Sequence, residues 1–364
     1  MTSVSSSPPT VRSRSLSRIL PDYFGSAGST FLTLLGCGIL ATIAWFVLDW
    51  AVLRATFDAT ATREECLARG GACWSVIAAR WRIILFGIYP FEEQWRSALA
   101  CTVVVTIIVV SCIPWFWRFW RLASVWVLGT AAFYLLMRGG VFGLRLVSEQ
   151  NWGGLALTLL MFATTSVLGM PLAIVLALMR RSKMPVIAKT TGIFIDTVRS
   201  LPLLAILFTF AVVVPFMLPD FLVGEKLYRV IAASTLFFAA YEAEIIRGGL
   251  QGIAKGQEEA AQALGLSYWQ SMSRVILPQA FRLALPATIN QFVITFMETS
   301  LIVVVGFIEL LAAGNAAYQT GEWRFAYVEV YAFVAAIYFV FVFGLSRYGA
   351  YLEGRLSVGR KQDH

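Results

Sequence analysis

Histidine and charge are both scarce in this sequence. Its 364 residues include a single histidine, His364, and only 14% are charged, about half the share of an ordinary globular domain. Without histidine in the body of the chain, a zinc site, a Ser-His-Asp triad or a haem site lacks its usual ligand or base. Hydrophobic residues make up 59% of the chain and the mean hydropathy is +0.74, so we expect an all-α integral membrane protein rather than a soluble enzyme.

The five cysteines show no CxxC spacing, and we expect no metal site. Cys37, Cys101 and Cys112 lie within apolar runs, where inert buried thiols are typical. Cys66 and Cys73 lie in a polar segment instead. They would form a disulfide if that segment faces an oxidising compartment, and the sequence leaves this open.

Eight apolar runs approach or exceed the roughly 20 residues that cross a bilayer. They cover residues 31–53, 98–117, 122–137, 154–179, 191–217, 228–246, 286–312 and 326–349. The polar residues 1–29 and 351–364 are expected to be cytoplasmic tails, and residues 54–97 an external loop, in which 81–91 would form a short interfacial helix. Residues 30–150 would then be an N-terminal extension of three spans, and residues 151–350 a core of five.

The basic residues support this topology, with both termini in the cytoplasm. With the N-terminus inside, most arginines and lysines fall into cytoplasmic loops, as the positive-inside rule requires. The net charge of +8 is therefore explained by topology rather than by nucleic acid binding. One segment does not follow the positive-inside rule. The predicted external loop 54–97 carries six arginines: Arg54, Arg63, Arg69, Arg80, Arg82 and Arg96.

The polar segment 247–286, between the sixth and seventh runs, predicts a helical hairpin. Residues 257–264 are good helix formers, and Gly265 is a helix C-terminal stop. Ser267 and Gln270 have capping-box spacing and open a second helix, which Pro278 is expected to end. Alone, this pattern is also compatible with an interfacial hairpin that has no partner.

Ionisable residues within spans are costly and indicate function by default. Glu242 and Glu244 lie near the end of the sixth run, where Arg247 is placed for an ion pair with Glu244 within one helix. Their role is either structural or in an exit path. In the seventh run, a polar stripe either contacts substrate or fixes helix packing; it comprises Asn290, Thr295, Glu298 and Thr299.

The hairpin, within residues 248–285, closely resembles the EAA loop of permease subunits in bacterial ABC importers. Glu259-Ala260-Ala261 is followed after three residues by Gly265, then after nine by Val275, and after one more by Leu277-Pro278. The departure is Val275, where isoleucine is usual. The stretches 154–159, 199–203, 241–249 and 299–301 resemble the polar amino acid branch of these permeases, and the N-terminal extension resembles the larger permeases of general L-amino acid importers.

The resemblance implies a type I importer permease of the inner membrane that moves L-amino acids by alternating access. Its partners would be two ATP-binding subunits, a second and unlike permease, and a periplasmic amino-acid-binding protein. The chain itself would be non-catalytic, with ATP and Mg in the ATPase subunits, because no GxxxxGK[ST] phosphate loop occurs in it. The alternative is a secondary amino acid transporter driven by an ion gradient; a membrane enzyme is disfavoured by the lack of a catalytic cluster.

Two sets of site residues are expected, the first from the resemblance and the second mainly from the ionisable and polar residues within the spans. The coupling joint to the ATPase comprises Glu258, Glu259, Ala260, Ala261, Gly265, Val275, Leu277 and Pro278. The expected substrate pathway comprises Glu242, Glu244, Arg247, Asn290, Thr295, Glu298, Thr299 and Ser300.

Overall fold

The computed structural model describes residues 23–319 and 321–360. Helices dominate these ranges, and no named strand occurs among the described residues, which confirms the all-α expectation. The chain contacts divide into two units, Met1–Ser75 and Val76–His364. Of the predicted tails, residues 1–22 and 361–364 lie outside the described residues, whereas residues 351–360 form the end of α17.

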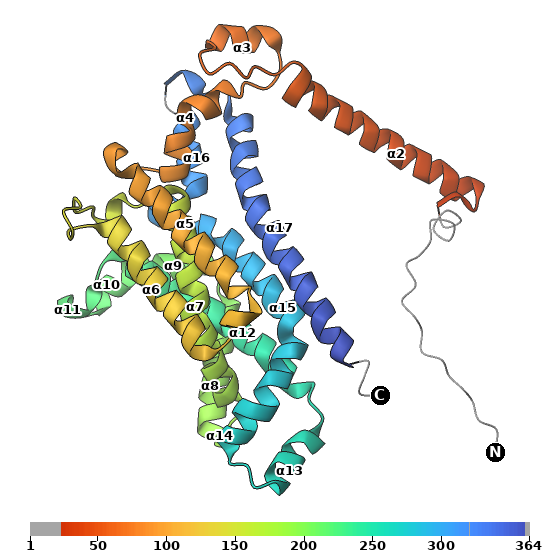
Figure 1. Cartoon of the computed structure of the whole chain (residues 1–364), viewed down its shortest axis with the longest axis vertical. Helices are drawn as coiled ribbons and strands as arrows, with labels where there is room; N and C mark the ends of the chain where they lie inside the picture. Colours follow the sequence, from red (N-terminus) through yellow and green to blue (C-terminus); the bar gives the residue numbers. More distant parts are fainter. Residues whose placement is uncertain (1–22, 320, 361–364) are drawn as a thin grey trace. The chain divides into compact units, whose positions relative to one another are not determined.

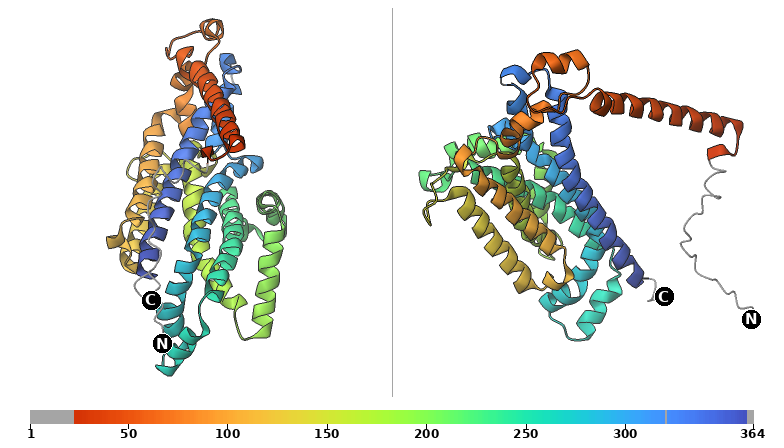
Figure 2. Two further views of the ribbon diagram at one scale, coloured as in Figure 1. Left: turned by 90° about the vertical axis from the view of Figure 1, so that its right-hand side faces the viewer. Right: turned by 45° about the horizontal axis from the view of Figure 1, so that its top comes forward.

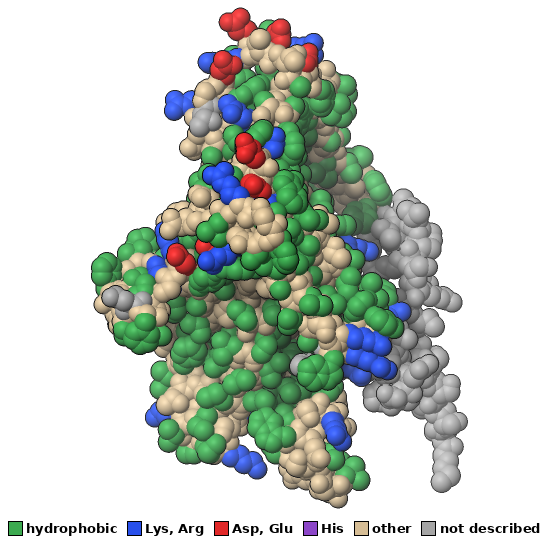
Figure 3. Space-filling model, turned by 60° about the vertical axis from the view of Figure 1, so that its left-hand side comes forward, with side chains coloured by type: hydrophobic (Ala, Val, Ile, Leu, Met, Phe, Trp, Pro, Cys, Tyr) green, Lys and Arg blue, Asp and Glu red, His purple; other side chains and the backbone are tan. Residues whose placement is uncertain are grey.

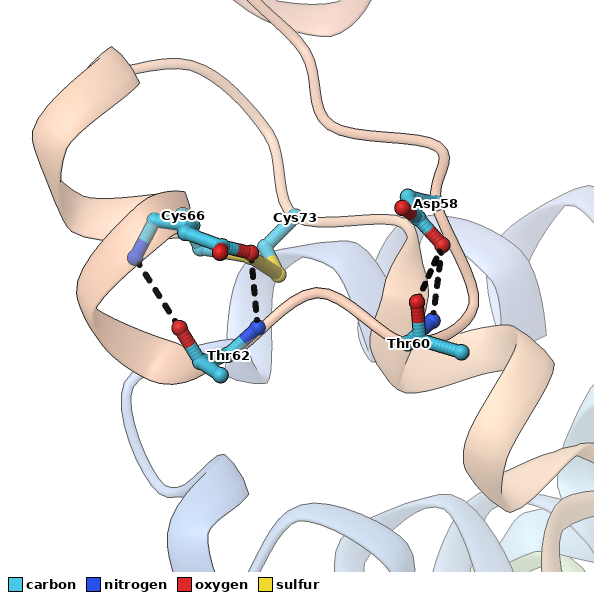
Figure 4. Close-up of a disulfide and its surroundings, with 6 residues drawn as sticks. Asp58, Thr60, Thr62, Cys66 and Cys73 are labelled. Carbon is cyan, nitrogen blue, oxygen red and sulfur yellow. Dashed lines mark hydrogen bonds between the residues drawn. A yellow bond between two sulfur atoms is a disulfide. The ribbon is translucent and has the colours of Figure 1, made fainter.

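The first unit contains α2 (Ala27–Leu48), a π-helical turn (Asp49–Leu53) and the short α3 (Arg63–Arg69). Thr62 begins α3 with a capping box. A disulfide joins Cys66 on this helix to Cys73, with the two Cα atoms 5.5 Å apart (Figure 4). The sequence left open whether Cys66 and Cys73 form a disulfide, and in the structure they do.

The second unit opens with three helices of the N-terminal extension: α4 (Ser75–Phe86), α5 (Gln94–Ser111) and α6 (Phe119–Arg138). The helix predicted at 81–91 corresponds to α4, which begins at Ser75 and ends at Phe86, and its interfacial position stays a prediction. Arg96 on α5 is fully buried and its guanidinium donates to the carbonyls of Leu136 and Arg145, at 2.6 and 2.8 Å. Because these carbonyls lie at and beyond the C-terminal end of α6, the arginine ties the two helices together.

The remaining helices form the core of the second unit. They are α7 (Gly154–Arg180), α8 (Pro185–Ser200), α9 (Leu203–Phe208), α10 (Val214–Met217), α11 (Asp220–Val223), α12 (Lys226–Gln251), α13 (Lys255–Ala263), α14 (Tyr268–Ser271), α15 (Leu277–Glu298), α16 (Leu310–Gln319) and α17 (Tyr327–Arg360). Helix α12 packs most extensively against α7 and α15 (Figures 1 and 2). At the centre, Gly169 on α7 admits the ring of Phe238 on α12, because a Cβ at this glycine would lie 2.4 Å from that ring.

A polar cluster joins the extension to the core at the end of α6 distant from α13. Glu149 accepts from Arg138 and Tyr134 of α6, at 2.8 and 3.0 Å, and from Tyr228 of α12 at 3.3 Å. Burial alone would raise the pKa of Glu149, but its backbone and tyrosine hydrogen bonds, together with the Arg138 charge, hold that pKa below its usual value. The ionised carboxylate therefore links α6 to α12.

The predicted span 191–217 is not one continuous helix. The chain turns by 102° between Pro185–Ser200 and Leu203–Met217. Pro202 has no backbone N–H and pushes the preceding Leu201 into an extended conformation, with φ −98° and ψ 142°. Helix α8 therefore ends there, and a separate helix begins after the proline.

The predicted boundaries around Pro278 and 286–312 are also wrong. One helical stretch runs from Tyr268 to Val305, through a π-helical segment (Met272–Ile276) and into α15. Pro278 lies in the first turn of α15, where the missing N–H costs little, so it does not end the helix. Beyond Val305, Gly306 has φ +87° and breaks the helix before α16 begins at Leu310.

Among the described residues, six helices are long and apolar enough to cross a membrane, or seven if the bent pair is one span. The remaining predicted span corresponds to α12, whose 26 residues include five charged ones: Lys226, Arg229, Glu242, Glu244 and Arg247. Eight spans therefore stay a prediction. Figure 3 shows a broad hydrophobic zone on the second unit, with basic side chains at its lower end.

Candidate functional site

The predicted hairpin is present as α13 and α14 at one end of the helical bundle (Figure 1). Gly265 has φ +74°, and the amides of Gly265 and Leu266 bond back to the carbonyls of Gln262 and Ala261. This pair of hydrogen bonds is a Schellman motif, which ends the helix and reverses the chain. Ser267 then opens α14 through the predicted capping box.

Several large apolar side chains of the hairpin are exposed. The exposed fractions of Leu264, Trp269 and Tyr268 are 81%, 69% and 53%. Glu259 and Ala260 are exposed as well, whereas Ala261 is buried against the rest of the chain. Exposed apolar side chains of this kind are typical of a surface that contacts another protein or the membrane.

Two polar contacts connect α13 to the transmembrane helices. The Arg181 guanidinium, just after α7, lies 2.6 Å from the Glu258 carboxylate. Gln279 on α15 donates to the side chain of Gln257 at 3.2 Å. Of the other predicted coupling residues, Val275 and Leu277 are half-buried in the helix that returns to the bundle, and Pro278 is exposed.

Glu244 is the centre of a charge cluster near the same end. Its carboxylate lies 2.8 Å from Arg247 of its own helix α12, which confirms the predicted intrahelical pair. Arg180 of α7 lies 3.0 Å away and Arg199 of α8 lies 3.9 Å away. A carboxylate that attracts arginines from three helices holds those helices together at this end.

Glu242 faces a different side of α12. It is fully buried, and its Oε1 accepts from the Thr288 hydroxyl of α15 at 2.6 Å, while its Oε2 has no protein partner. This geometry is an interhelical hydrogen bond between α12 and α15. The two neighbouring glutamates therefore sit in separate environments.

Glu298 lines a small, partly open cavity of about 10 Å³ inside the bundle, room for about one water molecule. Thr295 and Thr299 line it too, so the structure brings together three members of the predicted polar stripe. The Thr295 hydroxyl is buried without a hydrogen-bond partner. Among the described residues, Glu298 forms neither an ion pair nor a hydrogen bond, so its carboxylate is uncommitted.

The other predicted stripe residues lie elsewhere. Asn290 is exposed and does not line this cavity, and Ser300 lines a separate surface pocket. Two hydroxyls that sequence reasoning missed complete the cavity: Thr165 from α7 and Ser234 from α12. The sequence feature that could have identified such residues is a polar side chain within an otherwise apolar helix. The run Thr164-Thr165-Ser166 has this feature.

No site for a metal emerges within residues 23–319 and 321–360, where no three His, Cys, Asp or Glu side chains are grouped to hold an ion. The chemistry that the arrangement offers is instead hydrogen bonding and charge within a bundle, with a hairpin that exposes apolar side chains at one end.

The chain resembles known transport proteins over nearly its whole length. It is 37% identical over 354 residues to the inner membrane amino-acid ABC transporter permease protein YhdY of Escherichia coli (strain K12), covering 96% of this chain and 95% of that protein. It is 32% identical to the glutamate/glutamine/aspartate/asparagine transport system permease protein BztC of Rhodobacter capsulatus, covering 94% and 92%. A crystal structure of an amino acid ABC transporter with histidines matches 56% of this chain and 92% of its own, with 30% identity and a TM-score of 0.49.

Both full-length relatives extend across the N-terminal extension as well as the core. Residues 169–358, which include the hairpin and Glu298, match the family described as binding-protein-dependent transport system inner membrane component. The chain belongs to this family, and it is a permease component of an ABC importer.

Proposed function

We propose that this chain carries L-amino acids across the inner membrane by alternating access, driven by ATP hydrolysis in partner subunits. The observation that carries the proposal is the hairpin α13–α14, a preformed turn with exposed apolar side chains and ion-paired to α7. The chain has no phosphate loop of its own, so ATP and Mg would be bound by the ATPase subunits. The permease would therefore be non-catalytic.

In this proposal the hairpin is the coupling element. Glu259, Ala260 and the exposed Leu264 and Trp269 would contact a groove of the ATPase, while Gly265 sets the turn. Movement of the ATPase would reach the bundle through the Arg181–Glu258 pair and the rigid helix that continues into α15. Because α7 also carries Arg180 of the Glu244 cluster, the same movement would act on that cluster.

The substrate pathway would pass the cavity at Glu298. Its carboxylate and the nearby hydroxyls of Thr165, Ser234 and Thr295 can bind an ammonium group and polar atoms of an amino acid. At about 10 Å³ the cavity is far too small for an amino acid, so α7, α9, α12 and α15 would have to separate during transport. The structure would then correspond to a conformation that is closed at this level.

The proposed assembly contains two ATPase subunits, a second and unlike permease, and a periplasmic amino-acid-binding protein. The names of the relatives support amino acid cargo, and that of BztC covers glutamate, glutamine, aspartate and asparagine. Both termini and α13 would lie in the cytoplasm, with the disulfide segment outside, where oxidation is favoured. Transport driven by an ion gradient finds no support in this family.

Reversing the charges of Arg181 and Glu258 tests the coupling role of the hairpin. The single variants Arg181→Glu and Glu258→Arg each place like charges together and are expected to lower uptake about two- to fivefold, because partly exposed pairs contribute little. The double variant restores an ion pair, with its polarity reversed, and is expected to regain most of the uptake. ATP-driven uptake into proteoliposomes containing the whole complex is the measurement.

Lys183→Glu provides a matched control, because it makes the same charge change two residues away. Lys183 is exposed and forms no ion pair with a described acidic residue, so uptake is expected to stay near the wild-type rate. If the double variant is no better than the single ones, the pair does not transmit movement from the hairpin.

A further inference from the structure

A large apolar cavity, partly open to its surroundings, lies where the extension meets the core, separate from the Glu298 cavity. It measures about 550 Å³, which lies within the range of small-molecule binding sites. Helices α5, α6, α7, α15 and α17 all contribute to its almost entirely apolar lining. Pro171 of α7 is part of the wall, and Ala123 of α6 presents only a methyl group there.

A second cavity of about 230 Å³ lies against the first. The two share five lining residues: Ile108, Cys112, Phe162, Leu345 and Tyr348. The second cavity extends along α5 and α17 in the direction of Val105 and Phe341, away from α13. Two adjoining apolar spaces can accommodate a ligand with two hydrocarbon chains.

Basic residues lie at the end of the larger cavity nearer α13. Arg282 lies one turn before the lining residue Leu285 on α15, and Arg355 lies one turn after Leu352 on α17. Arg118 precedes the lining residue Leu122 by four positions at the start of α6. Side chains three or four positions apart on one helix share a face, so Arg282 and Arg355 extend the faces that line the cavity. Arg118 directly precedes the first residue of α6.

These arginines are not neutralised by the protein. All three are exposed, and none forms an ion pair with an acidic side chain in the described part of the chain. Arg355 contacts the Tyr351 ring, 5.1 Å from its centroid. Basic residues beside an apolar space between membrane helices are a typical setting for an anionic lipid head group.

We propose that this pair of cavities binds one anionic phospholipid, with its acyl chains in the two apolar spaces and its phosphate beside Arg118, Arg282 and Arg355. The paired shape and the unneutralised charge both favour a lipid over a transmembrane helix, which would need neither. The lipid fills the space between α6 of the extension and α15 and α17 of the core.

The test measures lipid retention by the complete complex. The complex is reconstituted in bilayers of equal parts phosphatidylglycerol and phosphatidylcholine, extracted gently, and its bound lipids are counted by native mass spectrometry. Wild type is expected to retain about one phosphatidylglycerol per copy of this chain. Arg282→Gln and Arg355→Gln are each expected to lower its occupancy constant about fivefold, and Ala123→Trp, which fills the larger cavity, to abolish retention.

Two variants serve as matched controls. Leu128→Trp places the same ring on an exposed face of α6, and Arg145→Gln removes an exposed arginine at the other end of the bundle; both are expected to retain the lipid. Equal retention of the two lipids, or unchanged retention in Ala123→Trp, overturns the proposal. Loss of the second permease from the Ala123→Trp complex also overturns it, because a helix would then occupy the space.

Discussion

Replacing Gly265 by valine is expected to lower amino acid uptake about tenfold while the chain still inserts at its normal level. Gly265 has φ +74°, a conformation that costs other L-residues about 1–2 kcal/mol, and more for a β-branched one. A Cβ there meets no atom within 4 Å, so the strain falls on the turn and not on the packing of the bundle. The hairpin would lose the fixed geometry on which docking depends. Uptake and ATP hydrolysis by the purified complex are the measurements.

Gly256→Ala is the control for this prediction. Gly256 also has open space around its Cβ position, but its φ is negative within α13, where alanine is the better helix former. Its uptake is expected to match or exceed that of wild type. Full uptake in Gly265→Val would show that the turn at Gly265 has no part in coupling.

Glu298→Gln is expected to lower uptake of the transported amino acids at least about tenfold, with normal assembly. Glutamine keeps the shape of the side chain and removes its charge, and a hydrogen bond to a charged group contributes about 1.5–3 kcal/mol. Because Glu298 has no partner among the described residues, a loss of uptake in this variant would indicate a lost contact with the substrate and not a broken ion pair. Radiolabelled uptake of acidic, neutral and basic amino acids gives the profile.

Glu353→Gln removes the same charge from an exposed position on α17 and is expected to leave the profile unchanged. The uptake ratio between amino acids is the informative quantity, because a defect in assembly lowers all rates by the same factor. Should Glu298→Gln transport every amino acid as wild type does, the residue has only a structural role.

Local signals made the hairpin predictable. Gly265 and the capping box of Ser267 specify a turn within a few residues, and the structure contains both. The bend after α8 also has a local cause at Pro202, but the apolar character of 191–217 obscured it. At Pro278 the sequence predicted a helix end that is absent, because a proline in the first turn of a helix looks the same in sequence as one that ends a helix.

Contacts between distant residues were beyond the reach of sequence periodicity. Glu258 pairs with Arg181 across 77 positions, and the Glu298 cavity needs Thr165 from α7 and Ser234 from α12. Asn290 looked like a member of this polar stripe, but it lies five positions before Thr295, which turns it well around the helix. Such sites depend on how helices pack, which the apolar pattern of a membrane helix hardly specifies.

The most direct test of the central claim is to tag this chain at its C-terminus, purify it gently from native membranes and identify its partners by mass spectrometry. The account predicts an ATP-binding subunit with a phosphate loop in stoichiometric amount, together with a second and unlike permease. Gly265→Val should lower recovery of the ATPase and leave the second permease bound. Recovery of the intact chain alone, under conditions that preserve known membrane complexes, would contradict the coupling role of the hairpin.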